Sequence, residues 1–417
     1  MKPTGKDVAP QDKAFGQRVQ KFRREQDRTQ TEFAAALGRT SSWLSQVERG
    51  VQPVQRMDVL QQIADELGVS VQQLRPAPAE AGEPSAAPTP TSLSNDLDET
   101  RSLLSGHPAL GVLLDTGDPL DRARSVQEIR RDIDDLWELT HAGQLAQVSD
   151  LAVTLLPELE RLSRVASDDK RELSLLLSRA YQALAAAFVR QDEAGAAWVA
   201  ADRAVFAAER SGDPLNVCAS VFRMVHAFVR LRSLDQAEHA AQTAVDALNA
   251  HGATDPEALS VLGSLHLSLA LVHARSSARA EAKEQIGRAR EIAAQLGNDR
   301  NDFDLEFGPT NVAIQAVSTA VDLGDAGEAL DIGLGINAEA LSTERQGRLL
   351  MDLGRAHAQR RHGGEALDCL IRAEAIAPEM IQTHQAARAA IRELVLVAGP
   401  NASQELLDLA ERAGALD

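Results

Sequence analysis

Apolar residues recur every three to four positions along most of the chain, which is the spacing of amphipathic helices. The first 75 residues hold short apolar runs between polar turns. Later runs are longer, rich in Ala and Leu, and interrupted by Gly-Asp, Asp-Pro and Pro-Glu steps that end and start helices. Because no alternating pattern predicts a strand, we expect an all-α fold. The core predicted for the first segment comprises Phe15, Val19, Phe22, Phe33, Ala34, Leu37, Leu44, Val47, Leu60, Ile63, Ala64, Leu67, Val69 and Leu74.

Residues 76–92 separate the two kinds of pattern. They hold five of the sixteen prolines and no large apolar residue, so they neither propagate a helix nor join a core. We therefore expect a flexible basic arm over residues 1–11, a small helical domain over 12–75, a Pro/Ala-rich linker over 76–95 and a long helical domain over 96–417.

The net charge of −18 is unevenly distributed between these parts. Residues 1–75 contain 12 Lys and Arg against 9 Asp and Glu, whereas the rest of the chain contains 31 basic and 52 acidic residues. An acidic average argues against nucleic acid, but the charge that faces the duplex decides binding, and a domain of net charge +3 can contact phosphates.

Two further observations restrict the class of protein. Cys218 and Cys369 lie far apart without Cys or His partners, so we expect neither a disulfide framework nor a metal site. The first residues lack the apolar segment of a signal peptide, and no run of about 18 apolar residues occurs, so we expect a cytoplasmic protein without membrane contact.

The segment 29–50 has the local signals of two helices joined by a tight turn. Thr29 and Glu32 have the spacing of a capping box, Gly38 supplies the turn, and Thr40 can cap the next helix. The sequence TQTEFAAALGRTSSWLSQVERG, followed by VLQQIADELGVSVQQL, resembles the lambda-repressor-like helix-turn-helix domains of the Xre family.

This resemblance implies a DNA-binding surface centred on the third helix, and an ion pair between Arg23 and Glu48 that joins helices 1 and 3. Gln46 is the one side chain of that helix with the bidentate amide that reads adenine, so the operator sequence is not predicted. Trp43 has two interpretations, contact with a thymine methyl group or packing on a neighbouring helix. The full set implied for DNA contact is Gln30, Arg39, Thr40, Ser41, Ser42, Trp43, Ser45, Gln46 and Arg49.

Small residues recur 12 positions apart in the second part of the chain. The pairs are Ala185 with Ala197, Val225 with Ala237, Ala270 with Ala282, Val317 with Ala329, and Gly354 with Ala366, and most have another Ala seven residues on, at Ala204, Ala244, Ala289 and Ala373. This spacing resembles tetratricopeptide repeats, in which small residues let two helices pack closely as a hairpin. We therefore expect a tetratricopeptide-like α-solenoid, with further hairpins over 120–164 and 379–413.

The inner face of such a solenoid is lined by the first helix of each hairpin. Amides and guanidinium groups there suit the carbonyls and terminal carboxylate of a peptide, although each can equally be an ordinary packing or solvated residue. The residues predicted to bind a ligand are Arg179, Gln182, Phe222, His226, Ser264, Asn311, Ser318, Arg348 and Arg355.

Residues 298–311 interrupt the repeat register. They contain Phe303, Phe307 and four carboxylates, so they are a candidate lid over the inner face. The alternative is a connecting loop that the two phenylalanines anchor.

An Xre-type domain joined to tetratricopeptide repeats is similar to the cytoplasmic peptide-sensing regulators of Gram-positive bacteria and their actinobacterial relatives. The resemblance implies a sequence-specific transcription regulator involved in quorum sensing. In such a regulator the repeat domain forms a homodimer, places two DNA-binding domains on an inverted-repeat operator, and binds a signalling peptide or other small ligand that modulates DNA binding. A protein-interaction adaptor and a ligand-independent repressor remain as alternatives. No H-E-x-x-H, G-x-S-x-G or nucleotide-binding motif occurs, so we expect neither catalysis nor a cofactor.

Overall fold

The computed structural model describes residues 10–26, 28–37, 41–49, 63, 66–67, 96–106, 124–165, 169–252 and 254–416. Contacts divide the chain into two compact units, Met1–Thr91 and Ser92–Asp417. Several predicted features lie outside the described residues: most of the N-terminal arm, the linker, Gly38, and the core positions Leu60, Ala64, Val69 and Leu74.

The described helices of the first unit are α1 (Pro10–Glu25), α2 (Gln30–Ala36) and α3 (Ser41–Glu48). The predicted core is confirmed for its described residues: all are buried except Phe22, which is partly buried and packs against the others. The capping box is also confirmed, because the Thr29 amide donates to Glu32 Oε2 at 2.8 Å and the Glu32 amide donates to Thr29 Oγ1 at 3.2 Å. At Gly16 a Cβ would lie 2.2 Å from the Val47 carbonyl oxygen, so glycine lets α1 approach α3 closely.

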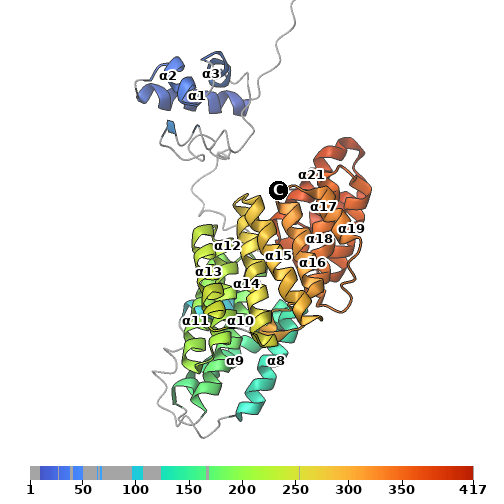
Figure 1. The fold of residues 1–417 in the computed structure, drawn as a ribbon. Helices are drawn as coiled ribbons and strands as arrows, with labels where there is room; N and C mark the ends of the chain where they lie inside the picture. The colour runs from blue at the N-terminus through green and yellow to red at the C-terminus, as the bar shows by residue number, and fades with distance from the viewer. Residues whose placement is uncertain are drawn as a thin grey trace, which may run out of the picture. The chain divides into compact units, whose positions relative to one another are not determined.

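The second unit is a succession of antiparallel helical hairpins that lie side by side (Figure 1). Its hairpins pair α8 (Val126–His141) with α9 (Leu145–Val165), α10 (Lys170–Arg190) with α11 (Ala194–Ser211), α12 (Pro214–Arg230) with α13 (Leu234–Ala250), α14 (Pro256–Arg275) with α15 (Arg279–Leu296), α16 (Pro309–Asp322) with α17 (Ala326–Gly333), α18 (Thr343–Gln359) with α19 (Gly363–Ile376), and α21 (Gln385–Ala398) with α22 (Gln404–Arg412). The additional elements are α6 (Asp98–Ser105), η1 (Asp302–Asp304), α20 (Pro378–Thr383) and η2 (Gly399–Asn401).

The five pairs of small residues spaced 12 positions apart lie in five of these hairpins, one pair in each. Every residue of the five pairs is buried, and in each pair the first residue lies on the first helix and the second on its partner. The tightest case is Gly354, where a Cβ would lie 2.8 Å from Cγ of Leu370. The spacing therefore identified the hairpins because it reports how closely two adjacent helices approach.

Six hairpins share the same turn, which the sequence did not reveal. Two residues after the first helix ends, the backbone enters the left-handed region, and the amide of the next residue donates to the carbonyl five positions earlier. Such a turn closes the last carbonyls of a helix. The left-handed residues are Gly143, Asp192, Arg232, Ser277, Gly324 and Arg361, so only two of the six are glycine.

The first helices of successive hairpins contact one another, from α8 through α10, α12, α14 and α16 to α18 and α21. They form a continuous inner layer, whereas each second helix contacts its own partner and the next hairpin. The arrangement is the one expected of a solenoid with a concave inner face.

The insertion between α15 and α16 forms an ordered strap, which we define as residues 298–308. Its ends are joined by a hydrogen bond from the Arg300 amide to the Phe307 carbonyl oxygen at 2.9 Å. Phe307 is fully buried and its ring covers Gly263 of α14, where a Cβ would lie 2.0 Å from Cζ of the ring. Phe303 is partly buried against the same core, so both phenylalanines anchor the segment.

Among the described residues, one helix, α14, is long and apolar enough to cross a membrane by length and composition alone. In the repeat body 78% of its apolar window is buried by other helices. The core helix of a helical array has the same composition, so this is weak support for a membrane span.

Candidate functional site

Arg23 of α1 and Glu48 of α3 form the ion pair predicted for the first unit. Arg23 donates from Nε to Glu48 Oε1 at 2.6 Å and from Nη2 to Oε2 at 3.1 Å, and both side chains are buried. Gln30 at the start of α2 donates from Nε2 to Glu48 Oε2 at 2.6 Å. One carboxylate thus holds three helices in register, and the second N–H of the Gln30 amide remains available to donate to a phosphate.

The residues of α3 implied for DNA contact differ in exposure. Ser41 and Arg49 are exposed, whereas Ser45 and Gln46 are half-buried. Trp43 is partly buried against the core of the unit, which is the packing interpretation of this residue. Arg39, Thr40 and the side chain of Ser42 lie outside the described residues.

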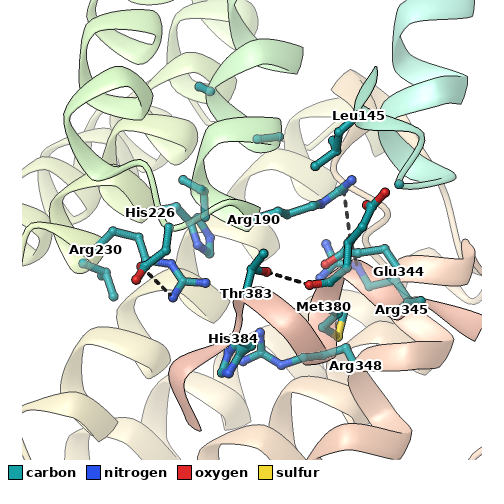
Figure 2. Close-up of a pocket in the computed structure, with 18 of the residues that line it drawn as sticks. Leu145, Arg190, His226, Arg230, Glu344, Arg345, Arg348, Met380, Thr383 and His384 are labelled. Atoms are coloured by element: carbon teal, nitrogen blue, oxygen red, sulfur yellow. Dashed lines mark hydrogen bonds and ion pairs between the residues drawn. The ribbon is translucent and has the colours of Figure 1, made fainter. Parts of the chain in front are cut away.

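The inner face of the second unit encloses a cavity of about 740 Å³. Figure 2 shows His226 and Arg230 of α12, Arg190 of α10, and Glu344, Arg345 and Arg348 of α18 around a common space that the α20 segment borders. A volume of this size accommodates a drug-sized ligand. The residues that line it include His141, Leu145, Arg190, Asp192, Phe222, Arg223, His226, Arg230, Arg232, Leu271, Arg275, Glu344, Arg345, Arg348, Glu379, Met380, Thr383, His384 and Gln385.

The cavity is partly enclosed because distant parts of the chain meet across the inner face. Gln385 donates from Nε2 to Asp192 Oδ2 at 2.9 Å, and Arg190 Nη2 lies 3.4 Å from Glu344 Oε2. Thr343 donates to the His141 carbonyl oxygen at 3.3 Å. The turns that end α8 and α10 therefore contact the last third of the array and narrow the groove.

Three of the nine residues predicted to bind a ligand line this cavity: Phe222, His226 and Arg348. The other six are not in its lining, and their contacts lie within the protein. Two of them are arginines in ion pairs: Arg179 pairs with Asp134 and Asp304, and Arg355 pairs with Asp322 and Asp352. Three donate hydrogen bonds: Gln182 to Asn216, Ser264 to the Ser260 carbonyl oxygen, and Asn311 to the Glu306 carbonyl oxygen. Ser318 accepts a hydrogen bond from Arg348.

Sequence reasoning missed the arginines at the ends of the first helices. Arg190, Arg230 and Arg275 are the last residues of α10, α12 and α14, and all three line the cavity. A basic residue in the last turn of a helix is common because it interacts favourably with the helix dipole. Its presence there does not by itself indicate that it lines a cavity. The signal available was the repetition of Arg at this one position in three successive hairpins.

The cavity carries a positive charge although the second unit is acidic. Its lining contains seven arginines, against three carboxylates, which belong to Asp192, Glu344 and Glu379. Burial, then the arginines around it, lower the pKa of His226 to about 3, so this imidazole is neutral. Burial and the Arg348 charge hold the pKa of His384 well below its usual value. Among the described residues no cluster of three His, Cys, Asp or Glu side chains could hold a metal ion.

Glu379 gives the cavity a pH-dependent contribution to stability. Burial, and then the charge of Asp96, raise the pKa of Glu379 to about 7. The folded protein therefore holds this proton more tightly than the unfolded chain, and the resulting stabilisation is lost as pH rises from about 4.5 through about 7.

We expect Glu379→Gln to have a higher melting temperature than the parent at pH 8 and the same melting temperature at pH 4.5. Thermal melts at the two pH values test this, with exposed Glu365→Gln as the control, and a difference that does not change with pH would contradict it.

The chain is similar to known proteins in both of its units. Residues 14–77 match the family model described as a helix-turn-helix domain. No curated protein matches the sequence. Similar solved structures include BtubC from P. vanneervenii, with 16% identity, a TM-score of 0.37, and coverage of 61% of this chain and 93% of that one. They also include a Rap protein complexed with competence and sporulation factor (14% identity, TM-score 0.42, 70% and 88% covered), and Bacillus thuringiensis PlcR in complex with the peptide PapR7 and DNA (13% identity, TM-score 0.31, 87% and 99% covered).

These findings define the class of protein. The chain has an N-terminal helix-turn-helix domain followed by a body of tetratricopeptide-like helical hairpins. The match to the helix-turn-helix family covers the first unit alone, and TM-scores below 0.5 assign no ligand to the cavity.

Proposed function

We propose that this protein is a DNA-binding transcription regulator whose repeat body forms a homodimer and binds a small ligand that changes its affinity for DNA. The observation that carries the proposal is the helix-turn-helix match over residues 14–77, on the same chain as a body that encloses a cavity of about 740 Å³. A cytoplasmic location follows from this role, and we assign the protein neither a cofactor nor catalysis.

DNA binding is assigned to α3. In helix-turn-helix domains the second helix of the motif enters the major groove and its N-terminal residues reach base edges. Gln46 has the amide that pairs with adenine, and further hydrogen-bond donors are available from Ser41 and Ser45 on the same helix and from Arg49 directly after it. The eight residues of α3 offer few base contacts, which favours two copies on an inverted-repeat operator.

Ligand binding is assigned to the enclosed cavity of the repeat body. Its walls combine the apolar side chains of Leu145, Leu271 and Met380 with the guanidinium groups of four hairpins, a mixture typical of pockets for small ligands. The contacts across the cavity join the turns that end α8 and α10 to the last third of the array. Occupation of the cavity is therefore able to alter the curvature of the body and the geometry of a dimer.

The direct test of DNA binding is selection from a random duplex library with the purified full chain. We expect enrichment of two half-sites in inverted orientation, about 10 base pairs apart or a multiple of that distance. Gln46→Ala should weaken binding to the selected sequence about 5- to 150-fold, because one bidentate base contact contributes about 1–3 kcal/mol.

Exposed Gln404→Ala in the repeat body is the matched control and should bind as the parent does. Affinity for the selected duplex should also fall steeply with salt. If the parent enriched the same sequences as Gln46→Ala and no others, the protein would not be a sequence-specific regulator. That result would favour the protein-interaction adaptor.

A further inference from the structure

Arg223 is a buried cation at the wall of the cavity. Its side chain lies on α12, the residue is 9% exposed, and its guanidinium is stacked over the rings of Trp137 at 4.8 Å and Phe222 at 5.1 Å. The aromatic faces hold the guanidinium in place but do not neutralise it. Its position is therefore fixed by the fold.

The other buried arginines of the cavity have carboxylate partners, and Arg223 does not. Arg345 lies 3.3 Å from Glu306, and Arg348 lies 2.9 Å from Asp352. Within the described parts of the chain no carboxylate lies within ion-pair distance of Arg223, which instead donates from Nη2 to the Asp304 carbonyl oxygen at 2.7 Å. Its buried Nε has no hydrogen-bond partner there. A buried charge without a counter-ion is costly, so the site is complete only with an anion.

The surroundings of Arg223 add to this positive potential. His226, one turn further along α12, stacks on Phe222 at 4.6 Å between ring centroids, and the charges that most affect its pKa are those of four arginines. The unpartnered Nδ1 of the buried His384 lines the same cavity. Arg223, His226 and His384 all line this cavity, and each side chain has an N–H group that can donate a hydrogen bond.

We propose that the cavity takes a ligand with an anionic oxygen group, carboxylate or phosphate, and that Arg223 is the residue that binds it. The inference rests on the proposed function, because it names the chemistry of the ligand. Guanidinium groups bind both oxyacids through paired N–H donors, so the shared chemistry covers an acidic peptide and a phosphorylated small molecule.

The test is isothermal titration of the full chain with two acidic probes. One is inorganic pyrophosphate, and the other is a pool of pentapeptides of Asp and Leu with a free C-terminal carboxylate. A neutral pool, with Asn for Asp and an amidated C-terminus, is the matched control. We expect one of the acidic probes to bind and the neutral pool to bind at least tenfold more weakly. Binding of either acidic probe supports the inference. Binding of the peptides indicates an acidic peptide as the ligand, and binding of pyrophosphate indicates a phosphorylated small molecule.

Arg223→Met should lower the affinity for that probe by about 30-fold or more, as expected on removing one partner of a buried charge pair. Its melting temperature should not fall, because an unpaired buried charge is removed. Arg372→Met makes the same charge change on exposed α19 and should bind as the parent does. Arg230→Met is a second cavity variant with the same expected direction.

Failure of both acidic probes, equal binding of the neutral pool, or unchanged affinity in Arg223→Met and Arg230→Met would overturn the inference. Arg223→Met should still select the operator from the duplex library. Loss of anion binding with retained selection therefore separates this inference from the DNA-binding function.

Discussion

Glu48→Ala is expected to unfold the N-terminal domain and abolish DNA binding. The carboxylate accepts hydrogen bonds from Arg23 and Gln30, and its removal leaves the Arg23 guanidinium buried without a counter-charge. Breaking a buried pair in this way costs about 3–5 kcal/mol. Small domains are stable by only about 5–15 kcal/mol, so the loss removes much of the total. Circular dichroism melts of the full chain should lose the transition of this domain.

Two comparisons separate the ion pair from a general effect of mutation. The double variant Arg23→Met/Glu48→Leu replaces both charges with apolar groups and should recover most of the stability. Glu66→Ala breaks the half-exposed pair with Arg28, at 2.7 Å, and should cost less than about 1 kcal/mol. If Glu48→Ala and Glu66→Ala melted alike, the structural role of Glu48 would be wrong.

Phe307→Ala is expected to destabilise the repeat body by about 3–5 kcal/mol, the usual cost of deleting a fully buried phenyl ring. The ring covers Gly263, where no side chain can fill the space that the ring vacates without a shift of the backbone. The effect extends to the strap, because Phe303, Asp304 and Glu306 have positive φ angles that cost about 1 kcal/mol or more each. Without its anchor the strap should relax from this conformation.

Limited trypsin digestion provides the second readout. Arg300 lies at the start of the strap and pairs with Asp302, so cleavage after Arg300 should be slow in the parent and fast in Phe307→Ala. Phe206→Ala makes the same chemical change on α11, where the ring is 62% exposed, and should leave both stability and cleavage close to those of the parent. Equal protection of Arg300 in parent and Phe307→Ala would show that the ring does not anchor the strap.

The sequence predicted the features that depend on neighbours along the chain. The Thr29 and Glu32 capping box involves contacts three residues apart, and Ala185 with Ala197 marks the approach of two helices joined by a short turn. Both leave a fixed spacing in the sequence, because the turn length is nearly constant. The all-α fold and the order of the hairpins follow from such local rules.

The cavity depends instead on the curvature accumulated over the whole array, which no local spacing records. His141, Arg190, Glu344 and Glu379 meet because the body curves far enough for its first and last parts to touch. The nine ligand residues were predicted from their place on the first helices, and in the structure Asn311 and Arg179 contact the strap. The separate helix α20 was also missed, because five of its six residues were included in the hairpin predicted over 379–413.

Occupation of the cavity is expected to change the affinity for DNA. The direct measurement is fluorescence anisotropy of the selected duplex, with and without the acidic probe, on the parent and on Arg223→Met. We expect the affinity to change about 5-fold or more in the parent, the usual range of coupling between two sites, and not to change in Arg223→Met. A parent that binds the probe and the duplex, with neither affecting the other, would contradict it.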